Sequence, residues 1–347
     1  MVRPEPRKLP RMLGQALDSL EQSVRQWDQD GYEEAIRSVW EHAQQSAPAE
    51  LDAALPRIAG LLGTMAVDAV GRLPVLGGAL VELGASPAPL VPMVVTGLVD
   101  TLRRVGTLIE TWPKGEERPD FDGDDYDDTV AVLSRTHTEE DAHAIAFAWY
   151  SVGTWIAPAL AVLQSGEVRS ALPNRDVLTG LVDRIGPLRE DLGFLVELLA
   201  VLDKEPFVVL HRPTGQGYEL TVSGVAGNFQ LQTLLAATLV GKESDGLIPG
   251  TPPDPAWVAA ATDGDLKPPG GIEGQFNLVD HTGSWIWGEG RPADIPVVDG
   301  RRVVLLEPQP YARSWSPGRL FDRMRPTVQL DRILPSAEVA AWLTRLG

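Results

Sequence analysis

Five polar residues in the last quarter of the chain carry the side chains best suited to chemistry: Asp280, His281, Glu289, Arg291 and Asp294. An imidazole can act as a general base near neutral pH, and a neighbouring carboxylate can orient it or exchange protons with it. His281 is the best candidate base, because it is the only histidine in this stretch, and Asp280 and Glu289 are further catalytic candidates. Arg291 and Asp294 are candidate ligand-binding residues, since a guanidinium can hold a phosphate or a carboxylate.

The secondary structure expected around these residues argues against one catalytic centre. Residues 276–280 and 284–288 are typical of two short strands joined by a turn, which places Asp280 and His281 at the turn. Glu289 and its neighbours follow the opposite strand end, about 15–20 Å away by the rise per residue of a strand. We therefore interpret Glu289, Arg291 and Asp294 as a local ion-pair network that fixes a loop.

Two tryptophans in the second of these strands point to a different use. Side chains alternate between the two faces of a strand, so Trp285 and Trp287 should project from one face and Ile286 from the other. An exposed pair of tryptophans is typical of a contact surface. Both tryptophans are therefore candidate ligand-binding residues.

Residues 301–332 are locally basic, with seven arginines and three acidic residues. Arginines interleaved with aromatic rings can bind a phosphate, a carboxylate or stacked bases. Pairing with the protein's own acidic surplus is the favoured alternative, because no glycine-rich phosphate loop accompanies them. The candidate ligand-binding arginines are Arg313, Arg319 and Arg323, interleaved with Tyr311, Trp315 and Phe321.

The motifs of known chemistries are absent from the sequence. Gly241-Lys242 lacks the glycine five residues earlier that a P-loop requires, and there is no Gly-x-Gly-x-x-Gly, Gly-x-Ser-x-Gly or His-Glu-x-x-His. Glu140 and His143 have the spacing of a bundle metal site, but no second Glu-x-x-His pair exists. Without cysteine there are no disulfides, iron–sulfur clusters or thiol nucleophiles. We expect no metal and no cofactor.

Composition fits an ordinary globular protein of 347 residues, with 44% hydrophobic and 22% charged side chains. The net charge of −18 disfavours nucleic acid and anionic membranes as partners. Residues 1–204 hold most of this charge, with 32 acidic against 18 basic side chains. The basic N-terminal stretch is not followed by an apolar run of signal-peptide length, which favours a cytoplasmic protein.

The first 204 residues are predicted to be all helical. A helical period over residues 11–46 is interrupted by Asp30-Gly31. Three Leu-Pro or Val-Pro pairs, at residues 55–56, 73–74 and 91–92, recur every 18 residues; they favour three short helices in series or are a coincidence in a Leu- and Pro-rich segment.

Two apolar runs, residues 73–99 and 144–163, raise the question of a membrane. Their proline and glycine content, their central aromatic residues and their lack of flanking basic clusters favour buried core helices. Pro158 is expected to kink or end the second helix. Residues 113–129 between the runs contain eight acidic side chains and are expected to form a solvated loop or a partner for arginines. An EF-hand is excluded, because the sixth and twelfth positions counted from Asp120 are Asp125 and Ala131 instead of glycine and glutamate.

Residues 205–347 show strand patterns instead. A hairpin is expected over residues 207–224, and Asn228 is expected to cap a helix that ends at Gly241. Asp299-Gly300 predicts a turn before a strand at 301–308, and residues 327–334 form the last strand candidate. Strands that alternate with helices predict one mixed sheet with helices packed on it.

The sequence thus predicts an α+β protein: an all-helical region over residues 1–204, either a bundle or a short solenoid, followed by a smaller α/β region with a mixed sheet over residues 205–347. The failure of every motif search favours a cytoplasmic interaction or scaffold protein without catalytic activity, which binds partner proteins and neither nucleic acid nor membrane. The alternative is an enzyme that acts on a phosphorylated or carboxylated small molecule at the C-terminal region.

Overall fold

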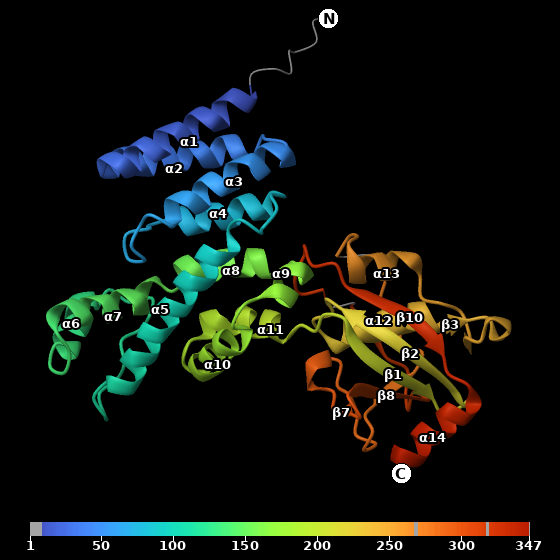
Figure 1. The fold of residues 1–347 in the computed structure, drawn as a ribbon. Helices are drawn as coiled ribbons and strands as arrows, with labels where there is room; N and C mark the ends of the chain where they lie inside the picture. Colours follow the sequence, from blue (N-terminus) through green and yellow to red (C-terminus); the bar gives the residue numbers. More distant parts are fainter. Residues whose placement is uncertain (1–8, 267–269, 317–318, 347) are drawn as a thin grey trace, which may run out of the picture. The chain divides into compact units, whose positions relative to one another are not determined.

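The chain folds into two compact units. The computed structural model describes residues 9–266, 270–316 and 319–346. The helical unit contains Met1–Leu163 and Ala171–Val196, and the sheet unit contains Gln164–Ser170 and Glu197–Gly347. Helices dominate the first part of the chain and a mixed sheet the second, which confirms the α+β class (Figure 1).

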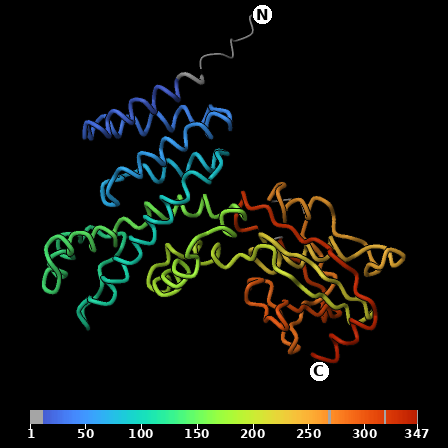
Figure 2. Tube along the Cα trace, in the orientation of Figure 1, coloured from blue at the N-terminus to red at the C-terminus, as the bar shows by residue number. Residues whose placement is uncertain are grey.

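In the helical unit, successive helices pack on one another. The first two form an antiparallel pair, the third packs on the first, and the fourth packs on the third and on the eighth (Figures 1 and 2). The helices bury their apolar stripes against one another, and leucine is the commonest buried side chain. The helices are α1 (Leu9–Gln26), α2 (Gln29–Ala43), α3 (Pro48–Leu62), α4 (Leu73–Glu82), α5 (Val91–Thr111), α6 (Tyr126–Leu133), α7 (Glu139–Ser151), α8 (Gly153–Leu163) and α10 (Arg175–Ile185), while α9 (Gly166–Ala171) and α11 (Gly193–Ala200) span the division between the units.

The proline repeat predicted from the sequence holds for two of its three members. Pro74 and Pro92 occupy the first turns of α4 and α5, where a missing N–H costs nothing. Pro56 lies inside α3, because that helix already begins at Pro48. The prediction of three equivalent short helices is therefore wrong.

The second apolar run bends, but not where the sequence predicted. The chain turns by 51° between α7 and α8, ahead of Gly153, and Pro158 lies inside α8. Pro158 instead packs against α4, since a Cβ on Gly78 would lie 2.6 Å from its Cα. Within the described ranges no single helix is long and apolar enough to cross a membrane; the bent pair α7–α8 has that length and composition.

The sheet unit is built on six strands in the order β10-β2-β1-β8-β6, with β7 also paired to β8. The β1–β8 pair is parallel and the others are antiparallel, so the predicted mixed sheet is confirmed. The strands are β1 (Glu205–His211), β2 (Gln216–Ser223), β6 (Asn277–Val279), β7 (Val297–Val298), β8 (Arg301–Glu307) and β10 (Thr327–Ile333). Two short pairs lie outside this sheet: β3 (Val240–Gly241) with β4 (Ile248–Pro249), and β5 (Ile272–Glu273) with β9 (Ser314–Trp315).

Both faces of the sheet are covered. The alternation along β1 sends Phe207 and Val209 into a core with α12 (Asn228–Leu239), near which lies α13 (Pro255–Thr262). Val208 and Leu210 face the other side, where they pack with Val339 of α14 (Ser336–Leu346). Strands buried on both faces explain the near-continuous apolar run of residues 207–210.

Three local predictions for this unit need correction. Residues 284–288 do not form a strand, and only an isolated bridge joins Val279 to Trp285. Gly227, not Asn228, is the N-cap of α12, because the Asn228 side chain donates to the carbonyl of Trp287, 2.8 Å away. The helix ends at Leu239 rather than at Gly241.

Candidate functional site

Asp280 holds a turn in shape. Its Oδ1 accepts hydrogen bonds from the backbone N–H groups of Thr282 and Ser284, at 2.8 and 3.0 Å, and from the Thr282 hydroxyl at 2.7 Å. Partial burial raises the pKa of Asp280, but these hydrogen bonds outweigh it and hold the pKa below its usual value. A carboxylate with three donors and a lowered pKa is suited to fixing a turn rather than to taking up a proton.

Among the described residues, the remaining catalytic candidates form no hydrogen bond with the Asp280 side chain, although His281 interacts with it electrostatically and contributes to its lowered pKa. His281 is half-buried, and its Nδ1 has no hydrogen-bond partner among the residues that the structure describes. Glu289 is exposed. Arg291 pairs with Asp294 at 3.0 Å and approaches Glu197 at 3.8 Å, so the Arg291–Asp294 part of the predicted ion-pair network is confirmed. Among the described residues Glu289 forms no ion pair, so its predicted place in that network is wrong.

The two tryptophans are brought together with an arginine. Trp285 and Trp287 are exposed, with ring centroids 5.8 Å apart, while Ile286 packs against the core, as the alternation predicted. Tyr311 lies 6.4 Å from Trp285, and the Arg313 guanidinium lies 5.8 Å from both of these rings. We call Trp285, Trp287, Tyr311 and Arg313 the aromatic surface.

The other candidate arginines lie elsewhere. Arg319 donates to the carbonyl of Gly264 at 3.0 Å, and the backbone N–H of Arg323 donates to Oε1 of Gln164 at 3.0 Å. The candidate arginines of residues 301–332 therefore lie at separate places in the sheet unit and do not form one cluster.

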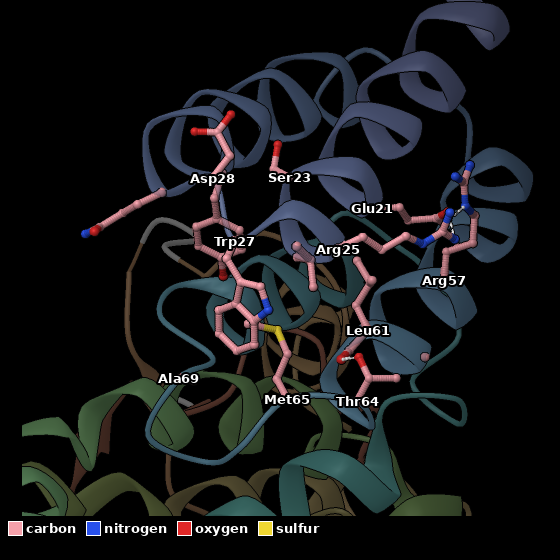
Figure 3. A pocket seen from close by; sticks show the side chains of 14 residues that line it. Glu21, Ser23, Arg25, Trp27, Asp28, Arg57, Leu61, Thr64, Met65 and Ala69 are labelled. Carbon is pink, nitrogen blue, oxygen red and sulfur yellow. Dashed lines mark hydrogen bonds and ion pairs between the residues drawn. The ribbon is translucent and has the colours of Figure 1, made fainter.

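A groove in the helical unit was not predicted from the sequence. It has a volume of about 740 Å³ and lies among the end of α1, the start of α2, the end of α3 and the loop that follows. Figure 3 shows the indole of Trp27 beside the Met65 side chain, with Leu61 of α3 and Thr64 of the following loop nearby. We call this cavity the Trp27 groove.

Three charged residues of the Trp27 groove form ion pairs. Arg57 lies 2.7 Å from Glu21, and Arg25 lies 3.4 Å from Glu21 (Figure 3). Arg57 also lies 2.7 Å from Asp18, which is not part of the groove lining. These hydrogen bonds raise the pKa of Arg57, chiefly the one to Glu21. The groove is thus apolar along Trp27, Leu61 and Met65 and carries paired charges beside them.

Trp27 has an unusual backbone. It joins α1 to α2 at φ +55°, in the left-handed region, and its side chain is 82% exposed. The sequence placed the break at Asp30-Gly31, but Asp28 caps α2 by accepting from the N–H of Gly31, 3.1 Å away, which draws Gly31 into the helix. The turn residue is consequently Trp27. The sequence signal for this turn is Asp28, a residue type favoured at helix N-caps, directly after Trp27.

Four non-glycine residues of the described ranges have positive φ: Trp27, Asn174, Lys204 and Asp299. Asparagine and aspartate tolerate the left-handed region, because their short polar side chains bond locally. Tryptophan and lysine have no such compensation, and Trp27 and Lys204 each line a cavity. A strained residue that lines a cavity is a reason to look for function there.

Comparison of the chain with models of protein families, with curated proteins and with solved structures found no match.

Proposed function

We propose that this chain is a cytoplasmic protein-interaction protein without catalytic activity of its own, and that its helical unit binds a partner protein through the Trp27 groove. The observation that carries this proposal is the exposed, strained Trp27.

The energetics of Trp27 favour a binding role. A left-handed backbone costs an ordinary residue about 1–2 kcal/mol, which glycine or asparagine would avoid. Burial returns little of that cost, because 82% of the side chain faces solvent. Tryptophan is also the residue type most often found at the energetic centre of protein interfaces.

The groove has the anatomy of an interface. An apolar strip beside paired charges resembles the apolar core and polar rim of a docking surface. A volume of about 740 Å³ accommodates a few large apolar side chains. The partner that fits best is an amphipathic helix that lays its apolar face along Trp27, Leu61 and Met65.

The walls of the groove are held by contacts that do not involve a partner. The Tyr32 hydroxyl donates to the carbonyl of Val70 at 2.7 Å and so ties α2 to the loop after α3. Arg57 ties α3 to α1 through Glu21. A groove that is preformed loses less conformational entropy on binding than one that must be assembled.

The aromatic surface supports a second contact in the sheet unit. Trp287 is 65% exposed and lies beside Trp285, and Tyr311 and the Arg313 guanidinium in turn lie beside Trp285. Tryptophan, tyrosine and arginine are the residue types enriched at interface centres. We assign the sheet unit the role of a second binding platform.

Photo-crosslinking tests the groove. A photoreactive amino acid at Thr64, which lines the groove, should give one stoichiometric crosslinked partner from source-cell lysate with the full-length protein. Trp27→Gly should weaken this capture about 30-fold, as expected when an interface tryptophan worth about 2 kcal/mol is removed. It should not lower the thermal midpoint, because glycine relieves the strain.

Trp40→Ala is the matched control, since Trp40 is a partly exposed tryptophan of α2 that does not line the groove. It should leave the crosslink unchanged. Equal capture by the Trp27→Gly variant, or no crosslink at Thr64, would overturn the proposal.

A further inference from the structure

The sheet unit contains a second cavity that differs in chemistry from the Trp27 groove. It has a volume of about 730 Å³ and is lined by residues from four separate segments. Those segments are residues 164–170, the turn before β1, the turn after β2 and the turn before β10. We call it the Lys204 pocket.

The side chains that line the Lys204 pocket are mostly cationic and hydroxyl-bearing. Four cations line it, against two carboxylates, in a chain whose net charge is −18. Three serines and Gln164 add hydrogen-bonding groups. The cations are Arg169, Lys204, Arg323 and Arg325, and the carboxylates are Glu167 and Asp203.

One ion pair forms a rigid part of the wall. Arg169 and Asp203 form a bidentate ion pair, with Nη2–Oδ1 at 2.6 Å and Nε–Oδ2 at 2.9 Å. Their side chains are 1% and 8% exposed. This pair neutralises one cation and one carboxylate. The other cations of the lining are Lys204, Arg323 and Arg325, and the other carboxylate is Glu167.

The position of Lys204 is fixed at a cost in strain. Its φ is +54°, and its backbone N–H donates to the Ser223 hydroxyl at 2.7 Å. A lysine in this conformation is strained where a glycine would not be. Its exposed side chain has no ion-pair partner among the residues that the structure describes. The strain is explained if the ammonium group is required at this place.

Arg325 can also turn towards a ligand. Its contact with Asp263, at 3.1 Å, joins two side chains that are 67% and 61% exposed. Exposed ion pairs of this kind contribute little to stability, so a doubly charged anion can compete for the guanidinium.

We infer that the Lys204 pocket binds a ligand that carries a phosphate group. The phosphate lies between the Lys204 ammonium and the Arg325 guanidinium, and the hydroxyl groups in the rest of the pocket bind the polar remainder of the ligand. Free phosphate and phosphorylated small molecules share this chemistry, and the size of the cavity, several times that of a phosphate group, favours a small phosphorylated compound such as a sugar phosphate. The inference does not depend on the Trp27 groove, because it concerns the other unit.

Calorimetric titration of the full-length protein tests this inference with three probes: inorganic phosphate, glucose 6-phosphate and glucose. A phosphorylated probe should bind saturably and more weakly as salt rises, while glucose alone should not bind. Tighter binding of glucose 6-phosphate than of phosphate identifies a phosphorylated compound as the source, and equal binding identifies free phosphate.

Lys204→Gly separates binding from folding. It should raise the dissociation constant at least tenfold while leaving the thermal midpoint the same or higher, because it removes the ammonium and the strain together. Lys204→Arg should stay within about threefold of the original affinity, since the charge is kept. Lys242→Met, at an exposed lysine of the same unit outside the pocket, should leave binding unchanged. Failure of both phosphorylated probes to bind at millimolar concentration, or unchanged affinity in Lys204→Gly, overturns the inference.

Discussion

The Trp27 groove and the Lys204 pocket share a backbone feature and differ in their chemistry. A strained non-glycine residue lines each of them, with φ of +55° at Trp27 and +54° at Lys204. The groove offers an indole, a leucine and a thioether, whereas the pocket offers cations and hydroxyls. The turn determines the position of each side chain, and the chemistry of the side chain determines which ligand binds. The two units are therefore suited to different classes of ligand.

The two sites also differ in what holds them. Around Trp27 the contacts include a local cap, Asp28 on Gly31, and the hydrogen bond from Tyr32 to Val70. Around Lys204 the central contact is the buried ion pair of Arg169 and Asp203, which are 34 residues apart in sequence. The helical unit has a buried arginine too, but its partner Asp191 is only two residues away from Arg189.

The largest expected effect comes from breaking the buried pair of the sheet unit. Arg169→Met leaves Asp203 buried without a counter-charge, which costs about 3–5 kcal/mol. Arg189→Met should cost less, because the Asp191 side chain is 26% exposed and water can stabilise its charge. Hydrogen exchange of the β1 and β8 amides for the first variant, and of the α7 amides for the second, measures each unit separately.

A double variant shows whether the charge is responsible. Arg169→Met with Asp203→Leu removes both ions and should recover most of the lost protection in β1. A double variant that is no better than Arg169→Met alone would mean that the arginine acts through its packing, and the contrast between the two buried arginines would disappear.

Alkaline pH should weaken both units by a similar amount. Burial raises the pKa of Tyr32 in the helical unit and of Tyr218 in the sheet unit from 10.0 to about 12. The folded state holds the phenolic proton more tightly than the unfolded state. The contribution of each protonated tyrosine to the free energy of unfolding is therefore complete below pH 10 and is lost as the pH rises from 10 towards 12. For the fully buried Tyr218 this amounts to about 3 kcal/mol at most.

Phenylalanine variants assign the loss to each unit. Tyr32→Phe should reduce the pH dependence of the helical unit above pH 10, where burial also raises the pKa of Tyr126 and Tyr150, and should leave that of the sheet unit. Tyr218→Phe should reduce the pH dependence of the sheet unit alone. Unfolding in urea at pH 9 and 11, followed by hydrogen exchange in α2 and β2, measures both. An unchanged pH dependence in the substituted unit would show that the substituted tyrosine does not cause it.

Short-range patterns predicted much of the fold. The β1–β2 hairpin and the turn at Asp299-Gly300 follow from residue type and strand alternation alone. These features depend on neighbours in sequence, which is why they could be recognised.

Long-range contacts determine the rest of the fold, and no pattern in the sequence indicates them. Residues 164–170 join the sheet unit through the Arg169–Asp203 pair, and no periodic pattern links such distant positions. The candidate residues His281 and Glu289 were chosen by type, while the Lys204 pocket is assembled from four turns that only the tertiary fold brings together. Trp27 was missed because Asp30-Gly31 is ordinarily a turn signal, yet here the cap from Asp28 draws it into α2.

The smallest expected effect tests the comparison most directly. Asn174 has φ +55°, almost the same as Trp27, but asparagine tolerates this conformation. Asn174→Gly should therefore change the stability of the helical unit by only a few tenths of a kcal/mol. Trp27→Gly should increase it by about 0.5–1 kcal/mol, because relief of about 1–2 kcal/mol of strain exceeds the added freedom of glycine in the unfolded chain.

Thermal unfolding of both variants, with Lys204→Gly as the counterpart in the sheet unit, measures the difference. If Asn174→Gly were as stabilising as Trp27→Gly, the strain at Trp27 would be no greater than at an ordinary asparagine turn. The retention of an indole and an ammonium at these two turns would then need no explanation from binding. A clear gap between the asparagine and the other two positions would instead mean that both side chains are kept at a cost to stability, which is what selection for a ligand produces.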